Sequence, residues 1–591
     1  MVLKMRAQSG PSTSLARASG LPVCGSVPVA GGEPKKLSLG SLRPAQGFIY
    51  ALAGDGRQAY FAGSLDGVSF DLLRVATLEP GPATRLVGPV GVGRTRGHVS
   101  TFVELPDAGR LVYQADQDVI GQPRLVSVRT DGAPEHIRLT DPPAGGYALN
   151  LRWWGSERIV YELTTGIRTD LFSVPIDRRS EPVALTAGLV DRYLSNYTVP
   201  SSDGRSLAFM AGESRGRLLE LYTVPVDGSA PPLELSGTLV PGGTLVEYSL
   251  ALTADGASAV YLAEAETVGV VGLYSVPIDG SATPVKLSGS LVEGGDVQLN
   301  GSFGPRISTD GRRVVYGADG RVDERIELFV VPVDGSAAPR LLSGELQSAG
   351  DVQSDFVLTP DSRRVLYRAD ARVDERFELF SVPLDGSAAP ARLGPELAPD
   401  GVVRRFELSP DGALVLMRVD VEGDRRIELY ASPVVPGRGL VQLALPAGAS
   451  ASAGQPAIVS GGHALCLVEV AGEESRALFS LPLDGRPGIR LDWATQRGAA
   501  VQWFQVTPDG TTVVYLSDAE IDGVDELFAV PVDGSRRAVR KNEPFLPGQW
   551  VDTFQISADS NRVFYTANQE DDSTLELFEA FLKPPHRPRR L

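Results

Sequence analysis

Hydrophobic residues in this chain fall into short blocks that alternate with turn residues in a fixed order. One block is apolar at consecutive positions, as in Leu328–Val331, and continues into a Val-Pro-x-Asp-Gly phrase. The block before it ends in a tyrosine and follows a Pro-Asp-Gly turn, as in Val513–Tyr515. Short apolar runs bounded by Gly, Pro and Asp are typical of β-strands, and Asp-Gly pairs supply the positive φ that tight hairpin turns need. The pattern therefore predicts a series of β-hairpins.

The two blocks recur along almost the whole chain. The proline of the Val-Pro-x-Asp-Gly phrase, or the residue aligned with it, returns every 46 to 55 residues between Pro28 and Ala580. A sustained period of this length indicates a repeat architecture. Each period holds four candidate strands, which in the clearest unit are residues 501–506, 512–516, 526–532 and 538–540. Amphipathic helix spacing does not compete with this pattern anywhere in the sequence.

The third strand of each unit is apolar on successive residues, which is typical of a strand buried on both faces. Four-stranded antiparallel sheets of this kind, stacked face to face around an axis, form a β-propeller. We therefore predict an all-β fold of about eleven four-stranded blades. A solenoid β-helix is the main structural alternative. The last unit lacks a convincing fourth strand, and residues 34–39 offer a spare one that would close the ring and remove open sheet edges.

Eleven blades exceed the usual range of about four to eight in one ring. We expect two rings, with residues 21–300 forming blades one to five plus the closing strand, and residues 301–582 forming blades six to eleven. The irregular stretch Gly301–Pro305 marks the expected division. One oversized closed ring is the alternative. Residues 1–20 and the basic tail 583–591 are expected to be disordered.

A family resemblance follows from the same phrases. The Ser/Thr-Pro-Asp-Gly turn, as in Ser409–Gly412 and Thr507–Gly510, is paired with Glu-Leu-Phe-x-Val-Pro-x-Asp-Gly. This pairing resembles the TolB-type β-propeller repeat, a WD-repeat-like family, over roughly residues 45–580. The resemblance implies an envelope-associated binding scaffold, or the non-catalytic propeller of a prolyl-oligopeptidase-like enzyme. Unlike the exported members, this sequence shows no recognisable signal peptide. As it stands it would be cytoplasmic, and it would be periplasmic or envelope-associated if the true start lies upstream.

Charge and composition argue against several kinds of partner and site. The formal net charge of -17 argues against nucleic acid as a partner, because like charges repel. Cys24 and Cys466 lie in different repeats and cannot build a disulfide framework or a thiolate metal site. An apolar window long enough for a transmembrane helix is absent from the sequence. The oligomeric state is not readable from the sequence.

Acidic loops between the second and third strands are the most suggestive local chemistry. Two of them, Asp319–Arg325 and Asp370–Arg376, contain two arginines each, which should pair with the carboxylates. Oxygen-rich loops with glycine can bind calcium. No loop matches the calcium-loop motif, and no other cofactor is predicted. The loop without arginine carries the metal candidates, which are Asp518, Glu520, Asp522 and Asp525.

Aromatic residues provide the candidates for partner binding. Trp153 and Trp154 are adjacent, so in a strand they point to opposite faces, and one of them could be exposed. Phe303 lies in the irregular stretch and is the third candidate. A Gly-x-Ser-x-Gly match at Gly212–Gly216 falls in a hairpin loop without the helix that a nucleophile elbow requires. The chain has only four isolated histidines, so no catalytic set is predicted.

The sequence therefore favours a non-enzymatic propeller that binds a protein or peptide partner through its loop faces. Two alternatives stay open. One is a propeller that serves as the sensor or lid of a truncated envelope protein or hydrolase, and the other is an enzyme with a site in the channel.

Overall fold

The computed structural model describes the following residues: 35–36, 50–52, 58–63, 70–76, 84–90, 99–115, 122–133, 135–141, 146–155, 157–165, 168–189, 192–213, 218–298, 304–437, 439–447, 449–451, 457–459, 462–470, 476–492, 499–546, 548–569 and 575–582. Within them the fold is all-β apart from one short 3-10 helix, η2 (Pro106–Ala108). No helix in this described part is long and apolar enough to cross a membrane.

The strands form eleven antiparallel sheets, and each sheet is a blade. In chain order the first four blades are β2 (Tyr50–Leu52), β3 (Gln58–Gly63), β4 (Phe70–Ala76) and β5 (Thr84–Val90); β6 (Val99–Leu105), β7 (Arg110–Ala115), β8 (Arg124–Arg129) and β9 (His136–Arg138); β10 (Gly146–Trp154), β11 (Arg158–Thr165), β12 (Arg168–Pro175) and β13 (Val183–Ala184); β14 (Tyr193–Pro200), β15 (Ser206–Gly212), β16 (Glu220–Pro225) and β17 (Leu233–Glu234).

In the next four blades, the first strands of blades five to seven have only two residues each. They are β18 (Ala251–Leu252), β19 (Ser258–Ala263), β20 (Gly272–Pro277) and β21 (Val285–Lys286); β22 (Arg306–Ile307), β23 (Arg313–Ala318), β24 (Glu327–Pro332) and β25 (Arg340–Leu341); β26 (Val357–Leu358), β27 (Arg364–Ala369), β28 (Glu378–Pro383) and β29 (Ala391–Leu393); β30 (Val402–Leu408), β31 (Leu414–Asp420), β32 (Glu428–Pro433) and β33 (Val441–Leu443).

The last three blades end with the one that joins the two ends of the chain. They are β34 (Ser450–Ala451), β35 (Ala457–Val459), β36 (His463–Glu469), β37 (Arg476–Pro482) and β38 (Ile489–Arg490); β39 (Val501–Val506), β40 (Thr512–Ser517), β41 (Glu526–Pro531) and β42 (Val539–Arg540); β43 (Val551–Ile556), β44 (Arg562–Ala567), β45 (Glu576–Phe581) and β1 (Lys35–Lys36). The ninth blade has a fifth strand because β34 and β35 both pair with β36.

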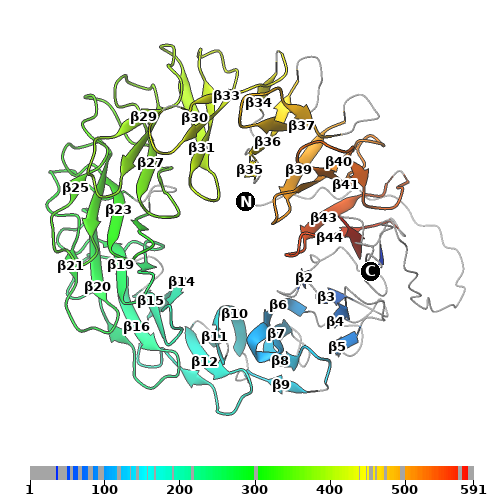
Figure 1. Ribbon diagram of the computed structural model, residues 1–591. Coiled ribbons are helices and arrows are strands. Elements are labelled where there is room, and N and C mark those ends of the chain that lie inside the picture. The colour runs from blue at the N-terminus through cyan, green and yellow to red at the C-terminus, as the bar shows by residue number, and fades with distance from the viewer. Residues whose placement is uncertain are drawn as a thin grey trace, which may run out of the picture.

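Figure 1 shows the blades following one another in chain order around a single ring. Among the labelled strands, the first strands β2, β6, β10 and β14 lie towards the centre, and the fourth strands β5, β9, β21 and β25 lie at the outer margin. The expectation of two rings is therefore wrong, and the oversized single ring is the form that the protein adopts. The expected boundary near residue 301 fails for a physical reason. Val260 and Leu262 of β19 share one buried cluster with Val314 and Tyr316 of β23, so the fifth and sixth blades pack face to face.

We call the packed contact between two neighbouring blades a seam. Each described seam from the first blade to the eleventh holds a buried cluster of the same kind. Side chains on alternate positions of the second strand enter different clusters: Val314 packs towards the fifth blade, whereas Val315 packs towards the seventh. The third strand behaves in the same way: Phe329 and Val331 of β24 enter the cluster shared with the fifth blade, and Leu328 and Val330 enter the cluster shared with the seventh. The prediction that the third strand is buried on both faces is confirmed. In seven blades an aromatic ring of the second strand stacks on an aromatic ring of the third strand, as Tyr316 does on Phe329 at 5.6 Å. Each interior blade is thus held from both sides.

Ring closure takes the form that the sequence indicated. In β1, Lys35 and Lys36 pair antiparallel with Glu579 and Phe578 of β45, so the N-terminal strand completes the last blade. Lys541 supports the same junction from the tenth blade. Its ammonium is buried and donates a hydrogen bond to the carbonyl oxygen of Phe581 at 2.9 Å, where β45 ends.

The recurring turn phrase also has a structural role. Pro332 is the last residue of β24, where its missing N–H costs no ladder hydrogen bond. Gly335 follows with a φ of 67°. A Cβ added there would lie 2.5 Å from Cγ1 of Val285, which belongs to the fourth strand of the preceding blade. The Asp-Gly turn therefore makes a hairpin and a close contact between blades at once.

Candidate binding face

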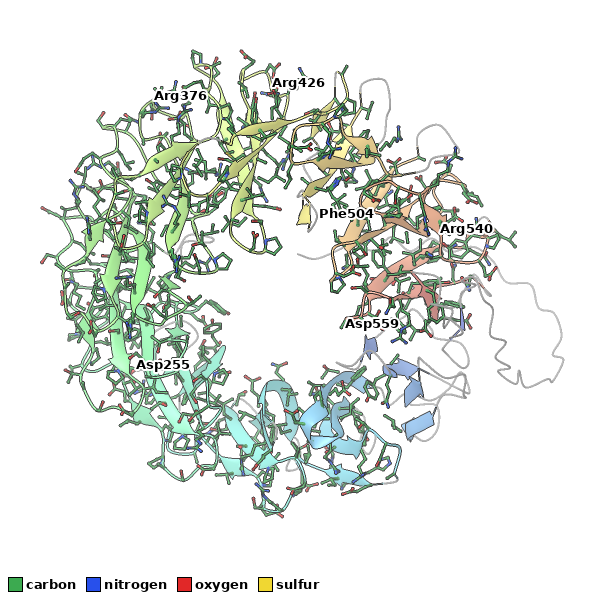
Figure 2. The ribbon with its side chains drawn as sticks, in the orientation of Figure 1. Asp255, Arg376, Arg426, Phe504, Arg540 and Asp559 are labelled. Atoms are coloured by element: carbon green, nitrogen blue, oxygen red, sulfur yellow. The ribbon has the colours of Figure 1, made fainter. Side chains whose placement is uncertain are left out.

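Antiparallel connectivity divides the connections of each blade between the two faces of the ring. Loops from strand two to strand three, and from strand four to the next blade, lie at one end of the strands. We call this end the loop face. The tight turns after strands one and three lie at the other end, which we call the turn face. In Figure 2, Arg376 and Arg426 come from the loops of the seventh and eighth blades, whereas Asp255 and Asp559 come from tight turns.

Acidic side chains outnumber basic ones on the loop face of blades five to eight. The acidic residues are Glu264, Glu266, Glu293, Asp296, Asp319, Asp323, Glu324, Glu345, Asp351, Asp370, Asp374, Glu375, Glu396, Asp400, Asp420, Glu422 and Asp424. The arginines among them are Arg321, Arg325, Arg372, Arg376, Arg425 and Arg426. This excess of carboxylates makes the local potential negative.

Two carboxylates that the sequence placed in solvated loops are in fact buried. Asp319 accepts hydrogen bonds from the backbone N–H groups of Asp296 at 2.5 Å and Glu324 at 3.3 Å. Asp370 accepts the equivalent bonds from Asp351 at 2.6 Å and Glu375 at 3.0 Å. These carboxylates close their own loops and attach them to the segment that leads into the first strand.

Asp296 and Asp351 extend this arrangement across the seams. The carboxylate of Asp296 accepts a hydrogen bond from the N–H of Val271 in the preceding blade at 2.6 Å. Asp351 does the same with the N–H of Ile326 at 2.7 Å. Sequence reasoning missed this role, although the recurring Gly-Asp-Val-Gln at 295–298 and 350–353 signals it. Because each aspartate bonds to two blades, the loop face is a rigid platform.

Glutamates at the start of the third strands are buried against arginines. Glu327 lies 3.3 Å from Arg325 and 3.4 Å from Arg321. Burial raises the pKa of the Glu327 carboxyl, and the two nearby guanidinium groups oppose that shift. Local ion pairs of the loop arginines are therefore confirmed, but the partners differ from the expected ones. Among the described residues, three of the four arginines pair with the glutamates that begin the third strands, and Arg321 also with Glu345, rather than with the carboxylates of their own loops.

The loops of the sixth and seventh blades present the same side chains outward. Val322 and Val373 occupy equivalent tips and are each 41% exposed. Glu324 and Glu375 follow at left-handed backbone positions, with φ of 62° and 59°. The two neighbouring blades therefore offer the same combination of an exposed valine and flanking charges.

The left-handed glutamates lead to a stability prediction. We expect Glu324→Gly combined with Glu375→Gly to raise the free energy of unfolding by about 1–2 kcal/mol, because an L-residue at positive φ costs about 1–2 kcal/mol and glycine returns part of this in chain entropy. The thermal midpoint measures the effect. Asp323→Gly is the matched control, because it adds a glycine one residue away without relieving a positive φ, and it should lower the midpoint. A double variant that melts below the parent would contradict the prediction.

The predicted metal loop does not gather its carboxylates. Asp518 is buried and accepts a hydrogen bond from the N–H of Ala500 at 2.7 Å, while Glu520 pairs with Arg540. Asp522 is exposed, and burial raises the pKa of Asp525. Among the described residues no group of three or more His, Cys, Asp or Glu is placed to hold a metal ion. Arg540 of the fourth strand supplies the positive charge that loop arginines supply in blades six and seven. The calcium hypothesis finds no support.

The aromatic candidates are only partly placed. Trp153 and Trp154 lie in β10, where they pair with Val160 and Ile159, but their side chains fall outside the described residues. Phe303, His98, His586 and most of Gly212–Gly216 also lie outside them. His136 is exposed on β9, and Nδ1 of His463 lies 2.9 Å from Oγ of Ser480. Of these residues, the described His136 and His463 begin a fourth and a second strand, so both lie beside tight turns on the turn face.

Comparisons with known proteins identify no family. No family model matches the chain, and no curated protein matches it. Among solved structures, a prolyl endopeptidase is 15% identical over 70% of this chain and 52% of its own, with a TM-score of 0.30. Porphyromonas gingivalis dipeptidyl peptidase 4 is 12% identical over 66% of this chain and 59% of its own, with a TM-score of 0.37. This chain thus spans little more than half of either peptidase.

An oligogalacturonate lyase from Vibrio parahaemolyticus is 11% identical over 67% of this chain and 99% of its own, with a TM-score of 0.30. Because all three TM-scores are low, the assignment of a β-propeller rests on the strand pairing and ring arrangement of the chain itself.

Proposed function

We propose that this protein is a TolB-type propeller scaffold whose loop face binds a protein or peptide with a basic surface. The observation that carries the proposal is the pair of equivalent loops on the sixth and seventh blades. Each holds an exposed valine beside carboxylates on a backbone fixed by buried aspartates. Apolar contacts surrounded by charges are typical of protein interfaces, and complementary charge accelerates association.

The rigidity of the platform supports this function. A binding surface fixed before the partner arrives loses less entropy on binding than a mobile one. The aspartate bonds across the seams supply that rigidity for the adjacent blades five to seven. Two equivalent loops side by side also suit a partner with two contact points, because the second contact then forms within the complex.

Charge reversal at the two loops tests the proposal. We expect Asp323→Lys with Asp374→Lys to weaken partner binding by roughly 10–100-fold, because both exposed carboxylates would become repulsive to a basic surface. The measurement is affinity capture from native lysate by the parent protein, followed by titration of the captured partner against parent and variant. Salt should weaken binding to the parent more than binding to the variant.

The control places lysines on the opposite face. Ala338→Lys with Ala389→Lys adds positive charge to exposed positions of equivalent turns on the same two blades. This variant should bind like the parent. If the control loses the partner and the loop variant keeps it, the turn face is the binding surface. If neither variant changes the affinity, blades six and seven are not involved.

A further inference from the structure

A cavity of about 120 Å³ lies between the second and third blades, away from the paired loops of blades six and seven. Its lining includes Asp141 after the fourth strand of the second blade, and Tyr161, Leu163, Phe172 and Arg178 of the third blade. The cavity therefore combines apolar side chains with charged ones.

The cavity lies where the chain departs from its own repeat. Arg178 occupies the turn position that holds a left-handed glycine in other blades, such as Gly228 with φ 70° and Gly335 with φ 67°. Arg178 keeps this conformation with a φ of 50°, although a side chain at positive φ costs about 1–2 kcal/mol. Asp141 likewise stands where other blades have Gly237 or Gly289. Two positions that hold glycine in other blades thus carry opposite charges here, and their side chains meet across the seam.

Positive charge prevails around this pair. Arg178 donates to Asp141 at 2.7 Å and to the carbonyl oxygen of Arg138 at 2.7 Å. The carboxylate of Asp141 also lies 3.2 Å from Arg124 and 3.8 Å from Arg138. Three guanidinium groups therefore surround one carboxylate.

The remaining carboxylate is replaceable. Glu181 accepts a hydrogen bond from Arg178 at 2.9 Å, but its side chain is 83% exposed. Exposed pairs of this kind contribute only about 0–1 kcal/mol. A second carboxylate from solution can therefore take the place of Glu181 on the guanidinium at little cost.

The rest of the lining is mainly apolar and includes the hydroxyl group of Tyr161. The rings of Tyr161 and Phe172 stack at 5.8 Å, and Leu163 and Pro182 complete this part of the lining. Tyr161 is only 2% exposed, and its hydroxyl has no hydrogen bond to another described residue. In the seventh blade the equivalent hydroxyl of Tyr367 donates to the carbonyl of Ser343 at 2.9 Å. The Tyr161 hydroxyl remains available as a donor.

We propose that this cavity binds a small carboxylate with a short apolar body. The carboxylate would lie on Arg178 and accept a hydrogen bond from Tyr161, and the apolar body would pack against Phe172, Leu163 and Pro182. This site goes beyond the proposed partner-binding function and does not depend on it, since its residues lie on different blades from the paired loops.

The test uses butyrate and benzoate as probes, with butylammonium and benzylammonium as charge-reversed controls, and calorimetric titration of the full chain. We expect both carboxylates to bind and both amines to fail. Arg178→Gly should weaken carboxylate binding by about 10-fold or more, equivalent to about 1.4 kcal/mol. Because this variant restores the residue that the repeat uses at this turn, it is expected to fold. Its thermal midpoint verifies that.

Two further variants give effects of opposite sign. Tyr161→Phe should weaken benzoate binding about 3–10-fold through loss of one hydrogen bond to a charged group. Glu181→Gln should tighten it, because the competing carboxylate is gone. If the amines bind and Glu181→Gln weakens their binding, the site selects cations through Glu181 and the proposal is wrong. Absence of carboxylate binding at millimolar concentration, or binding that Arg178→Gly leaves unchanged, also overturns it.

Discussion

Replacing Glu579 with alanine is expected to destabilise the eleventh blade by about 3–5 kcal/mol, because it removes the buried carboxylate from a buried guanidinium and leaves the partly exposed Asp559, 3.7 Å away, as its remaining ion-pair partner. Arg562 and Glu579 lie 3.1 Å apart, and both side chains are 2% exposed. Glu579 is also the residue of β45 that pairs with Lys35 of the closing strand β1. The loss should therefore reach the junction of the two chain ends.

The repeat itself supplies the control for this prediction. In the second, third and seventh blades the equivalent arginine donates from Nε to a serine on the third strand, as Arg364 does to Ser381 at 2.7 Å. Glu579→Ser should accordingly cost less than Glu579→Ala. Hydrogen exchange of the β44 and β45 amides measures the local free energy of opening, which is suitable for a repeat ring that need not unfold in one step. Equal protection in parent and Glu579→Ala would contradict the prediction.

Much of this fold could be predicted from residue patterns. Consecutive apolar residues such as Leu328–Val331 require partners on both faces, and this local requirement gave the blades. The number of rings could not be predicted from the same patterns. It depends on the small rotation between neighbouring blades, which is set by how side chains such as Leu262 and Val314 fit across a seam. That fit involves residues about 50 positions apart and leaves no periodic signal.

The structure of the loop face was harder to predict, again because it depends on contacts between segments that are distant in sequence. The sequence predicts solvated acidic loops because Asp319 and Asp370 are each followed closely by a run rich in charged residues, which ends at Arg325 and Arg376. Their burial comes from the adjoining segments that hold Asp296 and Asp351. Arg540 similarly enters the loop of Glu520 from another strand of its blade. Such contacts change a carboxylate from a possible metal ligand into a structural acceptor.

The turn glycines lead to the second large effect. We expect Gly335→Ala to lower the free energy of unfolding by about 2–4 kcal/mol, as the sum of a left-handed alanine and an overpacked contact. The new Cβ would lie 2.5 Å from Cγ1 of Val285, so the seam between the fifth and sixth blades must open slightly to admit it. Thermal and chemical denaturation measure the loss.

Gly523→Ala separates the two contributions. Gly523 has a φ of 70°, and a Cβ there would meet nothing within 4 Å, so this variant should show only the conformational cost of about 1–2 kcal/mol. Val285→Ala provides the complementary test by removing the obstructing methyl groups. Combined with Gly335→Ala, it should cost less than the sum of the two single changes by about 1 kcal/mol, because contacting residues couple. Strict additivity would mean that the glycine serves its own turn alone. A double change that costs less than the sum of the single changes would mean that glycine is required in the Asp-Gly phrase for its contact with the preceding blade as well as for its own turn.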